Sequence, residues 1–97
     1  MNDAATPLEI RHDEAMHRFT TMVDGHTCEI DYRLDGRTMT ILHTGVPEPV
    51  GGRGIAARLT RFAVGVAEAR GWSVRPACSY ARVWFERNPS YAHLLAP

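Results

Sequence analysis

The stretch VPEPVGGRGIAARLTRFAVGV, residues 46–66, divides the 97-residue chain into two parts of different character. Its prolines break the preceding strand, and its glycines lead into an apolar stripe at helical spacing that consists of Ile55, Leu59, Phe62, Ala63 and Val66. Gly71 follows Arg70 and suits a left-handed C-cap, so we predict a helix of about five turns. Gly65 inside this helix costs up to about 1 kcal/mol relative to alanine, and we expect a close neighbour to explain it.

Antiparallel strands are predicted before this stretch. Residues 27–34 alternate between apolar and polar side chains, which is the period of a half-buried strand. Asp35-Gly36 and a second strand over residues 37–44 follow, which predicts a hairpin whose two turn residues both have positive φ. Asp24-Gly25 repeats this turn signal. Two further strands, over residues 16–23 and 8–12, complete a four-stranded antiparallel meander.

The chain after the long helix predicts one more strand and short C-terminal helices. The strand covers residues 72–76, and Ser79 is expected to cap a helix that runs from Tyr80 to about Arg87. Asn88-Pro89 stops that helix, because the residue before a proline avoids helical geometry. Tyr80 and Trp84 lie one turn apart, and we expect them to be paired core aromatics. Ser90 is expected to cap a last turn through Leu95. The predicted fold class is α+β, in a single domain over residues 1–97.

The charge balance limits the classes of partner. Eleven basic residues, all arginine, balance eleven acidic ones, which argues against a nucleic-acid or membrane binder. The arginine bias is compatible with an anionic ligand and equally with codon usage in a GC-rich genome. No signal peptide is expected, and no apolar run reaches the roughly 18 residues that cross a bilayer. With cysteines only at Cys28 and Cys78, these features predict a cytoplasmic protein with reduced thiols.

The glycine cluster Gly51–Ala56 is the first candidate site. Small residues let the backbone approach a ligand closely, and the first amides of the helix have no internal partner. Together with the helix dipole they suit a pyrophosphate, although a tight turn without a ligand explains the same glycines. A P-loop fits poorly because GK[ST] is absent, and a dinucleotide fold fits poorly because there is no parallel βαβ start with a downstream acid.

The pattern G-x-x-G-x-A of this cluster resembles the acetyl-CoA pyrophosphate loop of Gcn5-related N-acetyltransferases. Four separated motifs resemble, more closely, a short, YjdJ-like subfamily of that family: His43-Thr44-x-Val46-Pro47, Gly52-Arg53-Gly54-Ile55-Ala56, Pro76-x-Cys78-x-Tyr80 and Asn88-Pro89-x-Tyr91. The family usually has Arg or Gln at Gly51, so phosphate binding here is expected to depend on backbone amides and Arg53.

The resemblance implies acetyl-CoA as co-substrate, an amine as acceptor and no metal. The expected acetyl-CoA contacts are Thr44, Val46, Gly51, Gly52, Arg53, Gly54, Ile55 and Ala56. The pantetheine arm would lie along residues 43–46, and a backbone N–H near Thr44 would polarise the thioester oxygen. The chain is too short for the helices and terminal hairpin that grip the acceptor in larger relatives. The acceptor pocket is therefore open, completed by a partner subunit, or absent, and the oligomeric state is left open.

Cys78 and His43 are the candidate catalytic residues. Cys78 precedes a helix whose N-terminus favours a thiolate, and by resemblance it lies near the acetyl thioester, where it would either take the acetyl group or be an inert thiol. His43 would take a proton from the acceptor amine, or simply hold a neighbouring polar group. In larger relatives a tyrosine near the position of Tyr80 protonates the departing thiolate. Cys28 is assigned to packing, and the other histidines show no metal-ligand spacing.

Two classes of function follow from these residues. The first is an N-acetyltransferase, and the second is a non-catalytic acyl-CoA-binding or interaction module on the same fold. A purely structural domain, whose glycines only make a turn, is the third alternative.

Overall fold

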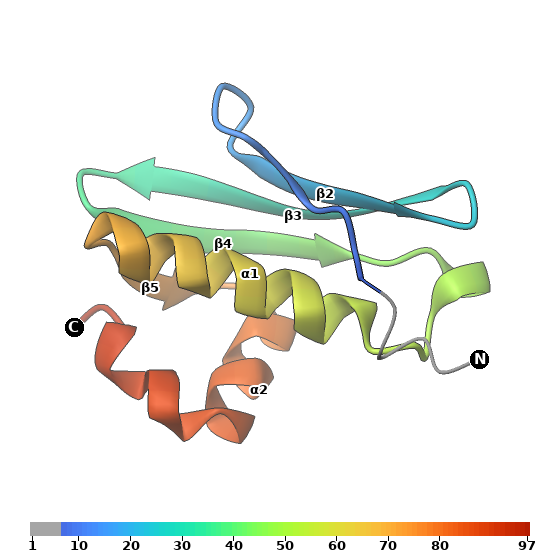
Figure 1. The fold of residues 1–97 in the computed structure, drawn as a ribbon. Helices are drawn as coiled ribbons and strands as arrows, with labels where there is room; N and C mark the ends of the chain where they lie inside the picture. The colour runs from blue at the N-terminus through green and yellow to red at the C-terminus, as the bar shows by residue number, and fades with distance from the viewer. Residues whose placement is uncertain (1–6) are drawn as a thin grey trace.

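A computed structural model describes residues 7–97, which form a five-stranded sheet with two α-helices (Figure 1). The strand order is β1-β2-β3-β4-β5; the first four strands are antiparallel, and β5 is parallel to β4. The elements in chain order are β1 (Arg11–Asp13), β2 (Arg18–Val23), β3 (His26–Asp35), β4 (Thr38–Gly45), the 3-10 turn η2 (Glu48–Val50), α1 (Ile55–Arg70), β5 (Ser73–Pro76), α2 (Ser79–Arg87) and the 3-10 turn η3 (Pro89–Leu94). The predicted α+β fold, with a meander, a long helix, a fifth strand and C-terminal helices, is confirmed.

The two hairpin turns differ from each other. In the β2–β3 turn, Asp24 and Gly25 have φ of 49° and 77°, as predicted for a two-residue turn of this type. In the β3–β4 turn the predicted position was wrong by one residue. Asp35 pairs with Thr38 inside the ladder, so the turn consists of residues 36 and 37, and only Gly36 has positive φ. A glycine in the first turn position is the requirement of a type II′ turn.

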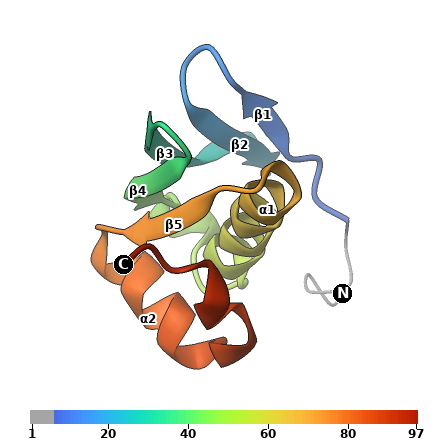
Figure 2. The same ribbon diagram turned by 90° about the vertical axis from the view of Figure 1, so that its left-hand side faces the viewer.

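The core lies between α1 and the face of the sheet that curves around it (Figure 2). The buried side chains of α1 belong to Ile55, Leu59, Thr60, Ala63, Val64 and Ala67. They pack on the fully buried side chains of the sheet, which are Phe19, Cys28, Ile30, Met39, Ile41 and Val74. Phe62, predicted to lie in the apolar stripe, is 41% exposed, because the buried face of α1 is rotated toward Thr60 and Val64.

The end of the chain packs beside β5. α2 and η3 contact each other, and α2 also contacts α1, β4 and β5 (Figure 2). Trp84 is buried against Phe85 and Tyr91, with ring centroids 5.1 and 5.3 Å apart. The predicted core pair of Tyr80 and Trp84 was wrong, since Tyr80 is 37% exposed and its ring faces the surface between the helices. By contrast, the face of β2 and β3 opposite α1 carries no helix within residues 7–97 (Figure 1).

The two glycines of α1 act differently. Gly71 ends the helix in the left-handed conformation, with φ of 71°, and its amide bonds the carbonyls of Ala67 and Glu68, as predicted. Gly65 lies in the interior of the helix, where a Cβ atom would meet nothing within 4 Å. The expectation that a close neighbour requires this glycine was therefore wrong.

Replacing Gly65 with alanine should stabilise the protein. The Gly65→Ala variant gains helix propensity and fills open space, so its free energy of unfolding should rise by about 0.5–1 kcal/mol in urea denaturation. Gly71→Ala is the matched control at the end of the same helix, and it should destabilise the protein because alanine is strained at positive φ. A Gly65→Ala variant less stable than the parent would contradict the helix geometry described above.

Candidate functional site

The site begins where β4 and β5 separate. Their last paired residues are Ile41 and Pro76, and beyond them the carbonyl of Ile41 accepts hydrogen bonds from the amides of Ala77 (3.0 Å) and Cys78 (3.1 Å) as the chain turns into α2. Residues 42–45 of β4 consequently have no strand partner on the β5 side. The backbone groups of these residues that point away from β3 are therefore available for a ligand in this gap.

A β-bulge lies at the point of separation. Tyr32 pairs with Ile41 and Asp31 with His43, so Leu42 is an extra residue in β4. A bulge bends its strand and increases the local twist, which turns the last residues of β4 away from β5. No pattern in the sequence indicated this bulge, although the resemblance implied that the two strands separate here.

The glycine loop forms an open helix N-terminus beside this gap. Gly52 and Gly54 both have φ of 75°, and a Cβ atom on either would meet nothing within 4 Å, so conformation explains these two glycines. Gly54 is the N-cap of α1 and provides no side chain to bond the first amides of the helix. The amides of residues 55–57 therefore lack an intrahelical acceptor and lie at the positive end of the helix dipole.

Gly51 and Arg53, unlike Gly52 and Gly54, make contacts that hold the loop in place. Gly51 has φ of −68° and its amide bonds the carbonyl of Glu48 at 3.0 Å, so it closes the η2 turn. Arg53 donates from Nη1 to Asp24 Oδ2 at 2.7 Å and thereby joins the loop to the β2–β3 turn. Its guanidinium, expected beside the phosphates, is thus engaged with Asp24 in this structure.

A groove of about 300 Å³ runs between α1 and α2 from the first turn of α1. It is lined by Ala57, Arg58, Arg61, Tyr80, Val83, Trp84, Arg87 and Asn88, so three arginines and no acid contribute to its walls. Partial burial raises the pKa of the Tyr80 phenol; Arg87 opposes this shift and Cys78 adds to it. Tyr80 is therefore protonated at neutral pH and able to donate a proton.

Cys78 is the N-cap of α2, a position that the sequence assigned to Ser79. Its Sγ accepts from the amide of Ala81 at 3.3 Å and lies 3.6 Å from Thr44 Oγ1. Thr44 and Cys78, both predicted site residues, thus meet across the gap between β4 and β5. Cys28, in contrast, is fully buried, and desolvation followed by the charge of Glu29 raises the pKa of its thiol, as suits its predicted packing role.

His43 lies on the other side of β4 from Cys78. It pairs with Asp31, whereas its neighbour Thr44 pairs with the buried Ile30 and contacts Cys78. Because successive strand residues point to opposite faces, the exposed His43 side chain lies on the uncovered sheet face. The two predicted catalytic residues are close along the fold without facing each other.

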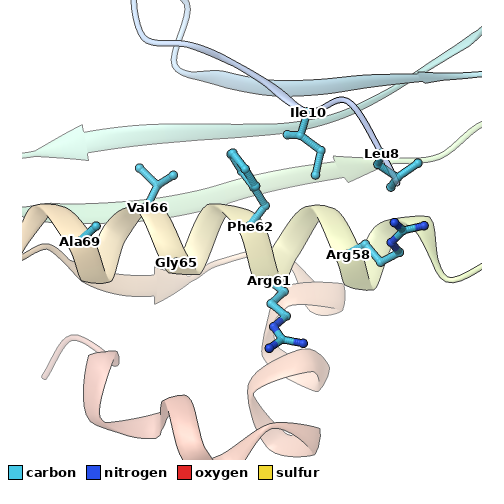
Figure 3. Close-up of a pocket in the computed structure, with 8 residues that line it drawn as sticks. All are labelled: Leu8, Ile10, Arg58, Arg61, Phe62, Gly65, Val66 and Ala69. Carbon is cyan, nitrogen blue, oxygen red and sulfur yellow. The ribbon is translucent and has the colours of Figure 1, made fainter. Parts of the chain in front are cut away.

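A wider cavity of about 560 Å³ lies away from these residues, between the segment before β1 and the outer side of α1 (Figure 3). Leu8 and Ile10 face Phe62 and Val66 across it, while the side chain of Arg61 points away toward α2 (Figure 3). Neither the amides of the glycine loop nor Cys78 line this cavity. The cavity shares Arg58 and Arg61 with the groove, but none of the predicted site residues lines it.

The remaining histidines have structural partners or lie on the surface. His12 Nε2 is 2.6 Å from the Tyr32 hydroxyl, and His93 Nε2 is 3.1 Å from Glu68 Oε2. Over residues 7–97, His, Cys, Asp and Glu side chains form no group of three that suits a metal ion. In the same part of the chain, neither helix is long and apolar enough to span a bilayer.

Several groove residues were not singled out from the sequence. Arg58 and Arg61 were assigned to the solvent side of the helix, although their spacing of three residues directly after the glycine loop would have placed both on one face. Arg87 had no comparable signal, because its position depends on how α2 packs against α1.

Comparison with known proteins links this geometry to one family. The model of the family described as GCN5-related N-acetyl-transferase matches residues 18–94. Protein NATD1 of Homo sapiens is 28% identical over 96 residues, covering 94% of this chain and 85% of the relative, and Protein NATD1 of Gallus gallus is 28% identical over 86 residues. A GCN5-like protein from Staphylococcus aureus, solved by NMR, superimposes with a TM-score of 0.74 at 30% identity, covering 92% of this chain and 88% of that one.

Proposed function

The chain belongs to the GCN5-related N-acetyltransferase family, and we propose that it binds acetyl-CoA between β4 and β5 and transfers the acetyl group to an amine. The observation that carries this proposal is the continuity of three features. The gap beyond Ile41, the open N-terminus of α1 and the arginine-lined groove adjoin one another. A ligand with an acyl thioester at one end and phosphates at the other matches this sequence of environments. We place the chain with the short, YjdJ-like members on its four motifs.

The pyrophosphate is proposed to bind the amides at the start of α1. Residues 52–56 carry the loop, and the free amides and the helix dipole favour a dianion there. Gly51 lacks the Arg or Gln side chain that the family usually has at this position. Arg58, Arg61 and Arg87 in the adjoining groove supply the missing positive charge for the phosphates.

The pantetheine arm and thioester are proposed to lie in the gap. The backbone of residues 42–46 has no strand partner on that side, so it can bond the amides of the arm and polarise the thioester oxygen near Thr44. Tyr80, two residues from Cys78 and lining the groove, is suited to protonate the departing CoA thiolate. This role gains support because the side chain is half-exposed in the groove instead of packed in the core.

Direct transfer to the amine is the route we propose. The Sγ of Cys78 already accepts from the Ala81 amide, and its contact with Thr44 makes it part of the wall of the gap. His43, on the other side of β4, would take a proton from the amine as its nitrogen attacks the thioester. Positioning of the two bound groups would then supply much of the rate. A non-catalytic acyl-CoA-binding module would share the binding residues and show no turnover.

Acetyl-CoA should raise the melting temperature of the protein. A ligand that binds the native state stabilises it by about 2.7 kcal/mol at a concentration of one hundred Kd, which thermal-shift titration detects readily.

The Arg61→Ala and Arg87→Ala variants should each weaken acetyl-CoA binding by about tenfold, and the loss should be larger at low salt than at high salt. Arg75→Ala, an exposed arginine of β5 outside the groove, is the matched control and should bind as the parent does. Absence of a shift at saturating acetyl-CoA would refute the binding site altogether.

The Cys78→Ser variant should retain acetyl transfer. Serine keeps an N-cap acceptor for the Ala81 amide, so stability should stay within about 0.5 kcal/mol of the parent, whereas Cys78→Ala should cost about 1 kcal/mol. Free CoA released with an acetylated amine measures turnover in both variants, and urea denaturation measures their stability. A stably folded Cys78→Ser protein with no turnover would favour the covalent route, in which the thiolate first accepts the acetyl group.

A further inference from the structure

Two side chains converge over Gly45 at the end of β4. Glu29 pairs with Gly45 across the β3–β4 ladder, and His43 lies two residues earlier on the same strand and the same face. A Cβ atom at Gly45 would lie 2.9 Å from His43 Nε2 and 3.1 Å from Glu29 Oε2. The absence of a side chain at Gly45 is therefore what lets the imidazole and the carboxylate lean toward each other.

Of the two carboxylates near His43, one already forms an ion pair and the other does not. Asp31, directly opposite His43, accepts from Arg18 Nε of β2 at 2.6 Å. The carboxylate of Glu29 is half-buried and makes no hydrogen bond or ion pair with any residue between 7 and 97, although Arg18, already bonded to Asp31, feels its charge. On the β5 side, Pro76 and Ala77 do not titrate, and the Cys78 thiol lies against Thr44 on the other face of β4. Glu29 is thus the anion beside His43 whose charge is still available.

The side chains of His43 and Glu29 lie on the opposite side of β4 from the groove. Thr44 contacts Cys78 on the side of α1, so by strand alternation the exposed side chain of the adjacent His43 lies on the other face. That face of β2 and β3 carries no helix within residues 7–97 (Figure 1). A second substrate can approach the end of β4 from this face without meeting acetyl-CoA in the groove. The half-buried carboxylate lies at the entrance of that approach.

We infer that Glu29 selects the acceptor by charge, holding a protonated primary amine beside His43. This inference rests on the proposed function of the gap. The ammonium group would bind Glu29 and lose one proton to the His43 imidazole, and the free amine would form the N–C bond as the C–S bond breaks. Tyr80 protonates the departing CoA thiolate and regains a proton from solvent as the nitrogen loses its second one there, and His43 releases the first to solvent. An acetamide, CoA thiol and one proton are the products.

Gly45 is required for this arrangement in a way that the sequence did not indicate. Any side chain there would displace the imidazole, the carboxylate or both. The Gly45→Ala variant should therefore lower turnover with a charged amine.

The test compares a charged with an uncharged amine in the full chain. Benzylamine is protonated at neutral pH and aniline is not, and CoA release with each gives KM and kcat. The Glu29→Gln variant should raise the KM for benzylamine by about tenfold, with kcat within twofold and the Kd for acetyl-CoA unchanged. Aniline should show no such change, and Glu29→Asp, which keeps the charge, should recover part of the loss. Asp35→Asn, on the same face of β3 and paired with Arg33, is the matched control and should behave as the parent.

Three results would overturn the inference. They are an unchanged KM for benzylamine in a folded Glu29→Gln variant, an equal rise for aniline, and a parent protein that binds acetyl-CoA and acetylates neither amine. Loss of acetyl-CoA binding by the parent protein is a different outcome, because it refutes the proposed function itself.

Discussion

The separation of β4 from β5 beyond Ile41 and Pro76 is the constraint on which the rest of this structure depends. Two features enforce this separation. The bulge at Leu42 turns the end of β4 away from β5. The hydrogen bonds from the amides of Ala77 and Cys78 to the Ile41 carbonyl turn the segment after β5 into α2. A paired edge at residues 42–45 would close the gap and satisfy the backbone groups that a ligand needs. The parallel pairing of the two strands up to this point keeps both sides of the gap rigid.

The positive charge of the site comes from several weak sources in place of one strong one. Loop glycines expose the first amides of α1, and arginines on α1 and α2 follow along the groove. This distribution fits a chain in which glycine occupies the usual place of a phosphate-binding side chain. It also separates two tasks, since Arg53 is engaged with Asp24 and helps to hold the loop against the β2–β3 turn.

Local patterns in the sequence were sufficient to predict the order of the helices and strands and the position of the glycine loop. The alternation in β3, the Asp24-Gly25 turn and the Gly71 cap each depend on neighbouring residues only, and all three were predicted. The contacts that the sequence could not supply are tertiary. The approach of α2 to α1 decides that Tyr80 lines a groove, and the bulge decides that His43 faces Glu29 instead of Cys78. The N-cap of α2 is Cys78 instead of the predicted Ser79, because the Cys78 Sγ accepts from the Ala81 amide. Cysteine is not among the residues from which an N-cap is usually predicted.

The most direct test of the central claim is an amide NMR titration of the protein with acetyl-CoA. The largest shift changes are expected at residues 42–45, at 52–57 and at Cys78, with smaller changes along the groove formed by Arg61 and Arg87. Changes confined to the apolar cavity beside Leu8, Ile10 and Phe62 would contradict this placement of the ligand, because none of residues 42–45, 52–57 and 78 lines that cavity.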